Sequence, residues 1–532
     1  MRFRITLLLF LCWFSVAASE LKFAWLTDIH VVEGNANSGQ LAKAVAEINA
    51  GDSEFVILSG DLTNTGDNQL VFAARLLSEL KKPLYAIPGN HETNWSRDPG
   101  LEEFSRLFGG RTFVFRAGNI LFAGFPSGPW GHMGDGYVEP ADLASVGAKL
   151  DAGLKPGDRV VFVCHYPLTS DVGNVREVIL FMKKYPVAAV LSGHTHQLAL
   201  LNADGISNAV GRALSLRHSD ETDAGYNLVT MGDDGRITIY NKTIGRDPVK
   251  AYSFIPGDGA GEKIEYVPFA ESSVPELKNL GRVKYFPVVP EYAPPGGGAR
   301  IGFRLTPDCL EAFDAQSGKR LWTFSPEGRF QAPPAVRDGL VAVGMWGQPR
   351  LFVLDAVSGK MKWSWNDGSS EVLFSPGNVT PVIGERNIAI VAPDRYLTIF
   401  DRETGEVKLR SNEYKFRESL GPGSDGRIAN AKTMDGKLVV IDVDAAHIVN
   451  AFDAGLGFEH TPVPPLELNG DVIMAGHRGD LVRISPASGG IKWHCRPSEC
   501  GYTFVGQVAL PGVGSRLAAV ADDGNVFVFD AN

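Results

Sequence analysis

Hydrophobic and polar residues alternate in two different ways along the chain. From Leu21 to about Pro256, short apolar runs are separated by longer amphipathic stretches such as NQLVFAARLLSELKK, which is typical of strands alternating with helices. From about Tyr292 onward, strand-like runs follow one another between Gly, Asp and Pro turns without a helical period. The sequence therefore predicts an α/β domain over residues 20–256 and an all-β domain over residues 292–532.

Two segments lie outside these domains. Residues 257–291, with the PPGGG run that comes soon after them, belong to a stretch rich in Pro and Gly that predicts a linker. Residues 1–19 combine the basic start MRFR, the apolar run ITLLLFLCWFSV and the small residues of VAAS. We expect a signal peptide that is removed, a periplasmic or secreted protein, and no membrane span in the mature chain. An uncleaved anchor is the alternative.

Five apolar runs in the first half lead directly into Asp, Asn or His. The runs are KFAWL before Asp28 and His30, EFVILS before Asp61, PLYAIP before Asn90 and His91, RVVFVC before His165, and VAAVLS before His194 and His196. Five of the 11 histidines fall at these positions, which chance would not produce. Because sites in α/β folds form where loops leave the carboxyl ends of strands, we expect these side chains to meet at one rim.

The chemistry of this set points to metal ions. Carboxylate, imidazole and amide ligands together suit divalent Mn, Fe or Zn, and eight groups are too many for one ion. Two neighbouring ions lower the pKa of a bridging water and clamp the attacking and leaving oxygens of an in-line phosphoryl displacement. The glycines before Asp61, Asn90 and His194 are expected to let the backbone turn sharply and approach the metals.

The ordered blocks DxH, GD, GNHE, H and GHxH resemble the calcineurin-like metallophosphoesterase superfamily. The resemblance implies a two-sheet α/β sandwich flanked by helices. It also implies ligand roles: Asp28, His30 and His196 for one metal, Asn90, His165 and His194 for the other, and Asp61 as the bridge between them. His91, with Asn90, is the candidate catalytic residue, because it would lie beside the metals and donate to the phosphate or protonate the leaving group.

The residue three positions after the bridging Asp distinguishes subgroups of this superfamily. It is Tyr in the purple acid phosphatases and Asp in the Ser/Thr protein phosphatases, but here it is Asn64. Asn64 can orient His91 by a hydrogen bond, although it cannot stabilise a charged imidazole as a carboxylate would. The stretch GDLTNTGD…GNHE is similar to the class III cyclic-nucleotide phosphodiesterases. Candidate substrate contacts in the rim loops are Asn64, Trp95, Trp130 and Tyr166, with ordinary loop packing as the alternative.

The second half of the chain is a repeat built on an apolar-Asp turn. Its anchors are Asp314, Asp355, Asp401, Asp442, Ser485 and Asp530, spaced 41 to 46 residues apart. A period in the forties with strand–turn–strand texture predicts a β-propeller of about six blades. Trp322, Trp363 and Trp493 each follow an anchor by eight residues and are expected to pack between blades. The last copy is short, so we expect a connector strand, RVKYFPVV, to complete the final blade.

The repeats resemble the quinoprotein (PQQ-like) propeller family, which raises a quinone-dependent dehydrogenase as a rival function. We expect no PQQ, because true quinoproteins have more blades and many carry a vicinal Cys-Cys pair that this sequence lacks. Cys495 and Cys500 are spaced to close a small disulfide loop, and two free thiols are the alternative. The net charge of −10, with no Lys/Arg-rich run, gives no nucleic-acid-binding signature.

The sequence thus predicts an exported hydrolase with a dinuclear metal centre. The expected reaction is hydrolysis of a phosphodiester by in-line attack of a metal-bridging hydroxide on phosphorus. The propeller is expected to bind a protein or polymer ligand. Two alternatives stay open: a phosphomonoesterase of the same fold, and a propeller-based binding protein with a vestigial phosphoesterase.

Overall fold

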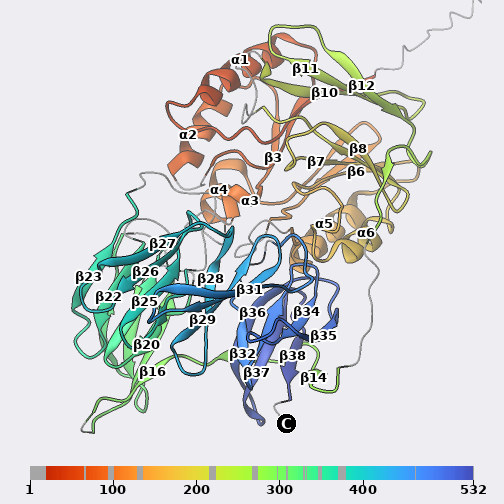
Figure 1. The fold of residues 1–532 in the computed structure, drawn as a ribbon. Helices are drawn as coiled ribbons and strands as arrows, with labels where there is room; N and C mark the ends of the chain where they lie inside the picture. The colour runs from red at the N-terminus through yellow and green to blue at the C-terminus, as the bar shows by residue number, and fades with distance from the viewer. Residues whose placement is uncertain are drawn as a thin grey trace, which may run out of the picture.

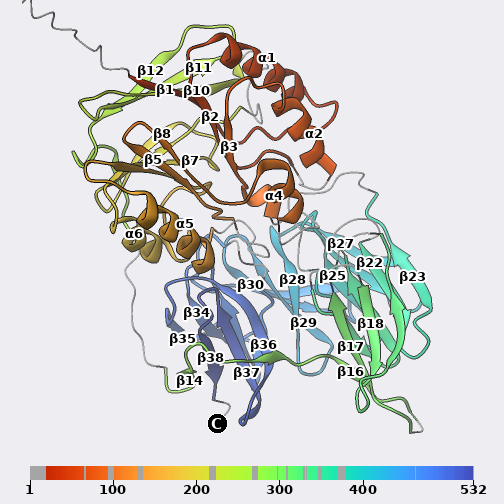
Figure 2. The ribbon, with the colours of Figure 1, turned by 180° about the vertical axis from the view of Figure 1, so that it is seen from behind.

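The computed structural model describes the chain from Glu20 to Asp530 with several gaps. The residues that it does not describe are 1–19, 65–67, 94–100, 129–135, 215–222, 267–273, 296, 307–308, 328–329, 331, 346–349, 369–378, 460, 462 and 531–532. The described part forms an α/β domain seated on one face of a propeller, as Figures 1 and 2 show from opposite sides. No helix within the described ranges is long and apolar enough to cross a membrane.

The α/β domain contains two sheets packed face to face. The six-stranded sheet has the order β12-β11-β10-β1-β2-β3, formed by Val249–Phe254, Ile237–Thr243, Gly225–Met231, Leu21–Leu26, Phe55–Ser59 and Leu84–Ile87. The seven-stranded sheet has the order β13-β8-β9-β7-β6-β5-β4, formed by Glu262–Lys263, Ala199–Ala203, Ile206–Val210, Val187–Ser192, Arg159–Val163, Ile120–Gly124 and Phe113–Ala117. Strands β1, β2 and β3 run parallel, as do β6 and β7, so the loops that leave these five strands reach the same end of the domain.

Helices cover the outer faces of both sheets (Figure 1). They are α1 (Ala36–Ala50), α2 (Asn68–Leu77), α4 (Glu102–Phe108), α5 (Pro140–Gly153) and α6 (Val175–Met182). The single turn α3 (Asn90–Thr93) instead follows β3 at the end of the sheet. Strand alternation explains the layers. In β1, Phe23 and Trp25 enter the core between the sheets, whereas Ala24 and Leu26 pack against α1, α2 and α4. Helices α5 and α6 cover the second sheet. The predicted α/β/β/α sandwich is therefore confirmed.

The C-terminal domain is a propeller of six blades, as the repeat predicted. Five blades have four strands each and follow one another in chain order. The first three are β16-β17-β18-β19 (Glu291–Tyr292, Ile301–Thr306, Cys309–Asp314, Arg320–Phe324), β20-β21-β22-β23 (Ala335–Arg337, Leu340–Gly344, Leu351–Asp355, Met361–Trp365) and β24-β25-β26-β27 (Val382–Ile383, Asn387–Val391, Leu397–Asp401, Val407–Ser411). The next two are β28-β29-β30-β31 (Phe416–Pro422, Ile428–Thr433, Lys437–Asp442, His447–Asp453) and β32-β33-β34-β35 (Leu466–Leu468, Asp471–Ala475, Leu481–Ile484, Ile491–Cys495). The sixth contains β36 (Tyr502–Leu510), β37 (Gly514–Ala521) and β38 (Val526–Phe529).

The connector closes the ring, but not with the strand that the sequence suggested. The outermost strand of the last blade is β14 (Leu277–Asn279), which pairs antiparallel with β38. The expected segment RVKYFPVV contributes only the two-residue strand β15 (Phe286–Pro287), on the opposite edge of the blade beside β36. Pro287 has no amide hydrogen to donate, so it suits an edge strand. It could not complete the hydrogen bonds of a strand that is paired on both sides.

The repeated tryptophans join neighbouring blades. Trp322 Nε1 donates to the Ala356 carbonyl at 3.2 Å, and Trp363 Nε1 donates to the Arg402 carbonyl at 2.9 Å. A Cβ added at Gly359 would lie 2.6 Å from the Trp322 ring, so the glycine of the next blade makes room for the indole. The expected packing of these side chains between blades is confirmed. Of the two alternatives for Cys495 and Cys500, the structure contains free thiols.

Glu276 stabilises the closure of the ring. Its carboxylate accepts a hydrogen bond from Trp493 Nε1 at 3.1 Å and forms an ion pair with Arg483, so the connector is tied to the fifth blade. We predict that Glu276→Ala lowers the free energy of unfolding of the propeller by roughly 1–3 kcal/mol, because hydrogen bonds to a charged group are lost. Urea unfolding followed by tryptophan fluorescence measures this.

The matched control is Glu406→Ala. Glu406 pairs with Lys408 on the surface and is mostly exposed, so its removal is expected to change the free energy of unfolding by less than about 0.5 kcal/mol. Equal losses in the two variants would contradict a specific closing role for Glu276.

Candidate metal centre

The predicted metal ligands meet at the ends of five strands, on backbone of an unusual shape. Asp28, His30, Asp61, His194 and His196 all have positive φ angles, between 44° and 70°. They are five of only eleven non-glycine residues with this conformation in the described part of the chain. Such backbone costs roughly 1–3 kcal/mol per residue and gathers at functional sites, where it aims side chains that an extended strand could not.

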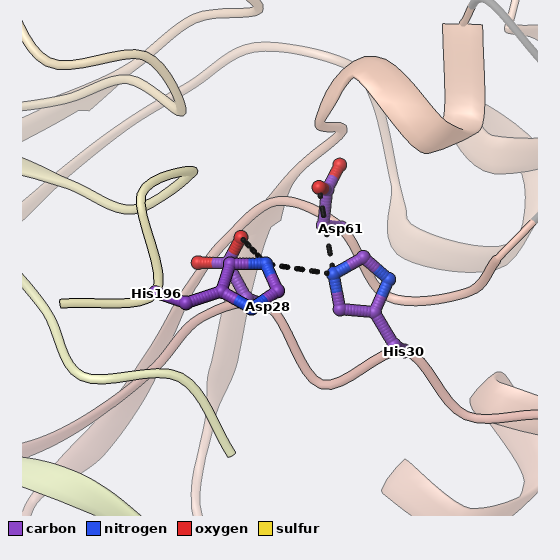
Figure 3. A group of neighbouring side chains, drawn as sticks. All are labelled: Asp28, His30, Asp61 and His196. Carbon is purple, nitrogen blue, oxygen red and sulfur yellow. Dashed lines mark hydrogen bonds and ion pairs between the residues drawn. The ribbon is translucent and has the colours of Figure 1, made fainter. Parts of the chain in front are cut away.

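The first cluster brings together Asp28, His30, Asp61 and His196 (Figure 3). One donor atom from each lies within 4.8 Å of the others. The Nε2 atoms of His30 and His196 face each other at 3.2 Å, and His196 Nε2 lies 3.3 Å from Asp28 Oδ1. His30 Nε2 lies 3.7 Å from Asp61 Oδ2. Two imidazoles and two carboxylates converging on one point form a donor set suited to a divalent transition metal.

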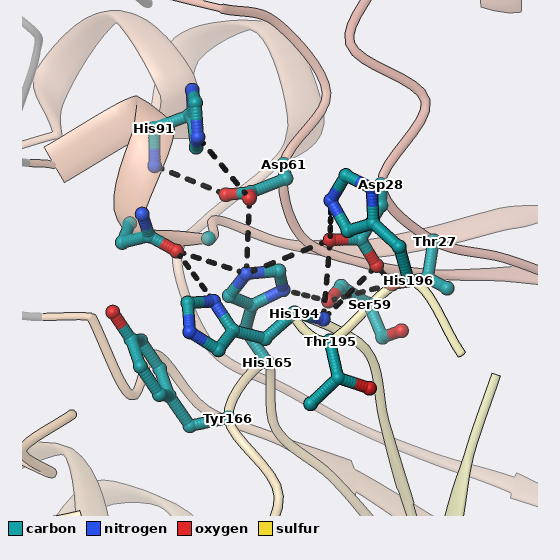
Figure 4. A network of polar contacts seen from close by, with 12 residues as sticks. Thr27, Asp28, Ser59, Asp61, His91, His165, Tyr166, His194, Thr195 and His196 are labelled. Carbon is teal, nitrogen blue, oxygen red and sulfur yellow. Dashed lines mark hydrogen bonds and ion pairs between the residues drawn. The ribbon is translucent and has the colours of Figure 1, made fainter. Parts of the chain in front are cut away.

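The second cluster shares Asp61 with the first. Asp61, His165 and His194 again offer donor atoms within 4.8 Å of one another. Asn90 completes this side, because its Oδ1 lies 3.0 Å from His165 Nε2 and 3.1 Å from His194 Nδ1. His165 Nε2 lies 3.2 Å from Asp61 Oδ2. Figure 4 shows the carboxylate of Asp61 above His165, with His91 on its other side. The two groups of residues thus match the two ligand sets that the resemblance implied.

Hydrogen bonds from outside the clusters fix the ligand side chains. His165 Nδ1 donates to the Ser59 carbonyl at 2.8 Å, so its Nε2 faces the site. Ser127 Oγ accepts from the amide of His165 at 3.0 Å. Thr27 Oγ1 donates to Asp28 Oδ2 at 2.7 Å. No sequence pattern distinguishes these serines and the threonine, because only their distances in the fold show that they support candidate ligands.

Three glycines touch the ligands directly. A Cβ at Gly89 would lie 2.1 Å from Asp61 Oδ1, and one at Gly60 would lie 2.6 Å from His165 Nδ1. At Gly193 it would lie 2.4 Å from Asp28 Oδ2. These glycines thus allow the backbone to approach the side chains of the candidate ligands closely, while their approach to the metals stays a prediction.

His91 lies beside the carboxylate shared by the clusters. Its amide donates to Asp61 Oδ1 at 3.0 Å, and its Nε2 lies 3.6 Å from Asp61 Oδ2. Its Nδ1 donates to the Asn64 carbonyl at 2.7 Å. Asn64 therefore orients His91 as expected, but through its main-chain carbonyl. This contact does not depend on the side chain at position 64.

Burial and ion pairing act in opposite directions on the buried carboxylates. Burial disfavours the charged form of Asp28, but the hydrogen bond from His196 and the charge of His165 outweigh it and lower its pKa to about 2. The same balance, with His165 as the main partner, holds the pKa of Asp61 well below its usual value. Burial lowers the pKa of His194 to about 4. Both carboxylates and this imidazole are thus in the states that bind metals.

His165 balances part of this negative charge. Burial disfavours its charged form, but the charge of Asp61 and a hydrogen bond to it dominate and raise the pKa of His165 to about 9. Without metals, the imidazolium is therefore the favoured form at neutral pH. Binding of a metal at this nitrogen has to release that proton.

Glu92, the last residue of the GNHE block, was assigned no role from the sequence. It is fully buried. Its Oε1 accepts from the amide and hydroxyl of Thr63 at 3.0 Å each, and its Oε2 accepts from the Gly89 amide at 2.9 Å. Burial, with the charge of Asp61, raises the pKa of Glu92 to about 7. Through these hydrogen bonds, Glu92 links the loop after β2 to the loop after β3. Its position in the GNHE block is the sequence feature that could have indicated a role in the site.

Of the predicted substrate contacts, Tyr166 is fully buried, and its ring lies 3.9 Å from the ring of His194, beside the candidate metal centre. Its contact with a substrate stays a prediction. Close packing of Gly136 on the Tyr166 ring explains this burial. Trp95 and Trp130 fall outside the described residues.

Comparison with known proteins agrees with this geometry. Residues 21–198 match the family model of the calcineurin-like phosphoesterases. The chain carries a calcineurin-like metallophosphoesterase domain. Residues 294–419 match a second model, described as outer membrane protein assembly factor BamB, as expected for PQQ-like repeats.

Two relatives of the metallophosphoesterase domain are described as probable cyclic nucleotide phosphodiesterases. The protein from Vesicomyosocius okutanii subsp. Calyptogena okutanii (strain HA) is 22% identical over 237 residues, covering 41% of this chain and 97% of that protein. The protein from Ruthia magnifica subsp. Calyptogena magnifica is 24% identical over 236 residues, covering 41% and 96%. A quinohemoprotein alcohol dehydrogenase from Comamonas testosteroni is 33% identical over 121 residues, only 19% of this chain and 16% of that protein.

Gly89 provides a test of the metal centre. We predict that Gly89→Ala reduces the metal bound by the metallophosphoesterase domain from about two Mn²⁺ per chain to about one or fewer. The reason is that the added Cβ must displace the carboxylate shared by both clusters, only 2.1 Å away. Elemental analysis after reconstitution and dialysis measures the ratio.

Gly39→Ala in α1 is the matched control. An added Cβ at Gly39 meets no atom within 4 Å, so this variant is expected to keep full metal content. Full metal content in Gly89→Ala as well would show that Asp61 is not a ligand.

Proposed function

We propose that the metallophosphoesterase domain hydrolyses phosphodiesters with two bound divalent metal ions. The observation that carries the proposal is the convergence of two donor clusters on one shared carboxylate, Asp61. The similarity to two probable cyclic nucleotide phosphodiesterases supports a diester over a monoester. It also makes cyclic nucleotides the first substrate class to examine.

The described residues fit such a pair of ions. Each cluster combines carboxylate oxygen with imidazole nitrogen, and Asn90 adds an amide oxygen, a mixture suited to Mn, Fe or Zn. When bound, two such ions supply Lewis-acid chemistry, lowering the pKa of a water molecule and neutralising charge on phosphoryl oxygens. Asp28, His30 and His196 would hold one ion, and Asn90, His165 and His194 the other, with Asp61 between them.

The remaining work falls to His91. Because its Nδ1 donates to the Asn64 carbonyl, its Nε2 is directed toward the shared carboxylate and lies at the edge of the centre. From there, Nε2 can donate to a phosphoryl oxygen or return a proton to the leaving oxygen. A carbonyl dipole stabilises an imidazolium less than a full carboxylate charge would. The arrangement therefore favours substrates whose leaving group needs little protonation.

We predict that removing a ligand from either cluster abolishes diester hydrolysis. With Mn²⁺ present, an aryl phosphodiester is expected to be cleaved faster than the matched aryl phosphomonoester. Asn90→Ala and His196→Ala are expected to lower kcat/KM by roughly 100-fold or more, because each disrupts a different cluster. Release of the aryl alcohol, followed by absorbance, measures both rates.

His447→Ala, an exposed histidine on β31, is the control and is expected to keep wild-type rates. Faster monoester cleavage would replace the proposal with a phosphatase. Equal rates in Asn90→Ala, His196→Ala and the wild type would show that the reaction does not use this centre.

Export and a ligand of the propeller are also part of the proposal. Export rests on the pattern of residues 1–19, and the propeller is an architecture widely used for binding. We predict that the protein expressed from the full coding sequence in a Gram-negative host is recovered from the periplasm or medium, with a mature N-terminus near Glu20. Intact-mass measurement checks this, and an intact Met1 in the cytosolic fraction would contradict it.

A further inference from the structure

A small, open cavity of about 40 Å³ lies where the two domains meet. Both domains supply its walls. The lining includes Ser170, Arg176 and Tyr266 on the side of the metallophosphoesterase domain, and Arg478, Arg496 and Glu499 on the side of the propeller. Neither domain forms this cavity alone, so its lining depends on how the propeller is docked.

The loop that carries a metal ligand also forms one wall of the cavity. This loop runs from His165, at the end of β6, to the start of α6. Its middle is held by Tyr266, whose hydroxyl donates to the Leu168 carbonyl at 2.9 Å. Its far end contacts the propeller, since a Cβ at Gly173 would lie 3.1 Å from Cys500 Cβ. The loop after β6 thus contributes His165 to the candidate metal centre and Ser170 to the wall of the cavity.

The lining carries more positive than negative charge. Three arginines face one acid, Glu499, in the wall of the cavity. Glu499 pairs with Arg176 at 3.2 Å, and both side chains are 46% exposed, so this ion pair is weak and easily exchanged for another partner. Because Arg496 pairs with Asp480, Arg478 provides most of the positive charge in this wall that no described acid pairs.

Buried groups beneath the cavity hold Arg478 in place. Arg478 Nε donates to His477 Nε2 at 3.1 Å, and His477 Nδ1 lies 3.0 Å from Glu459 Oε1. His477 thus bridges Arg478 and the buried carboxylate of Glu459. Lys432 Nζ donates to Glu459 Oε2 at 3.3 Å, and both side chains are 1% exposed.

Arg496 has a similar support. Its Nη2 donates to both carboxylate oxygens of Asp480, at 2.9 and 3.1 Å. A buried ion-pair network contributes little to the free energy of folding compared with apolar packing. Its main effect here is to fix the orientation of the two guanidinium groups. Two guanidinium groups that are held in place before a ligand arrives are well suited to an anion, because little side-chain entropy is lost on binding.

We infer that this cavity binds a second anionic group, a phosphate or carboxylate, that the phosphodiester substrate carries away from the scissile bond. The inference rests on the proposed phosphodiesterase function, and it gives the propeller a part in substrate selection. Arg478 and Arg496 would contact the anion, while Arg176 would exchange Glu499 for it.

A direct binding measurement tests the site without catalysis. The probe is inorganic phosphate, added to the full-length protein after its metals are removed with a chelator, and calorimetry gives the Kd. We expect Arg478→Gln to weaken binding by roughly 10-fold, the loss of one charge-assisted contact, and Arg478→Lys to weaken it less. Arg516→Gln, which changes an exposed arginine on β37 that does not line the cavity, is expected to bind as the wild type.

A kinetic comparison tests the source of the anion. The probes are the p-nitrophenyl diester of a nucleoside monophosphate, with and without an additional phosphate on its free ribose hydroxyl. We expect the wild type and Arg516→Gln to have kcat/KM values roughly 10-fold higher for the phosphorylated probe, and Arg478→Gln to bring the ratio of the two values toward one.

The outcomes separate the inference from the function on which it rests. Loss of both phosphate binding and probe preference in Arg478→Gln supports the inference. If Arg478→Gln loses phosphate binding but the wild type shows no preference for the phosphorylated probe, the anion is not part of the substrate. The cavity would then bind a free anion. Unchanged binding in Arg478→Gln overturns the site. No hydrolysis of either probe, with binding still dependent on Arg478, defeats the proposed function and leaves an anion site between the domains.

Discussion

The rest of the site depends on the contacts that the carboxylate of Asp61 makes. This carboxylate is buried, its Oδ2 lies 3.2 to 3.7 Å from three imidazole nitrogens, and its Oδ1 accepts the amide of His91. One side chain therefore belongs to both donor clusters and also positions the candidate proton donor. A glycine, Gly89, is needed beside it because any Cβ there would overlap its oxygen. Its ionised state in turn depends on the histidines around it, above all His165.

The scaffold makes this contact possible by bringing strand ends together. Parallel strands β1, β2 and β3 of one sheet and β6 and β7 of the other present their loops at the same end of the sandwich. Positive φ angles where the loops leave β1, β2 and β7 turn the side chains inward. This backbone conformation costs free energy, which the tight packing between the sheets offsets. The propeller then adds a second wall, and its docking surface meets the loop that follows β6 (Figure 1).

Much of the site could be predicted because metal-ligand chemistry is local in sequence. Each ligand follows a short apolar run, and each run is a strand of the sandwich. The supporting contacts could not be predicted in the same way. The partner of His91 is a main-chain carbonyl, which every residue offers, and Tyr166 looks like any aromatic residue in a rim loop until its packing on His194 is seen. The place of Glu92 in the GNHE block could draw attention to it, but only the structure shows that its carboxylate is buried and links two loops.

The sequence by itself determined the two types of fold, the candidate ligand set and the approximate number of blades, because these follow from local patterns: apolar runs, turn motifs and a repeat period. Only the tertiary structure decided what depends on residues far apart in the chain. It selected β14 instead of RVKYFPVV to complete the last blade, because pairing depends on which connector segment lies beside β38. It also placed Arg478 and Arg496 opposite the loop after β6, a juxtaposition across more than three hundred residues that neither segment encodes alone.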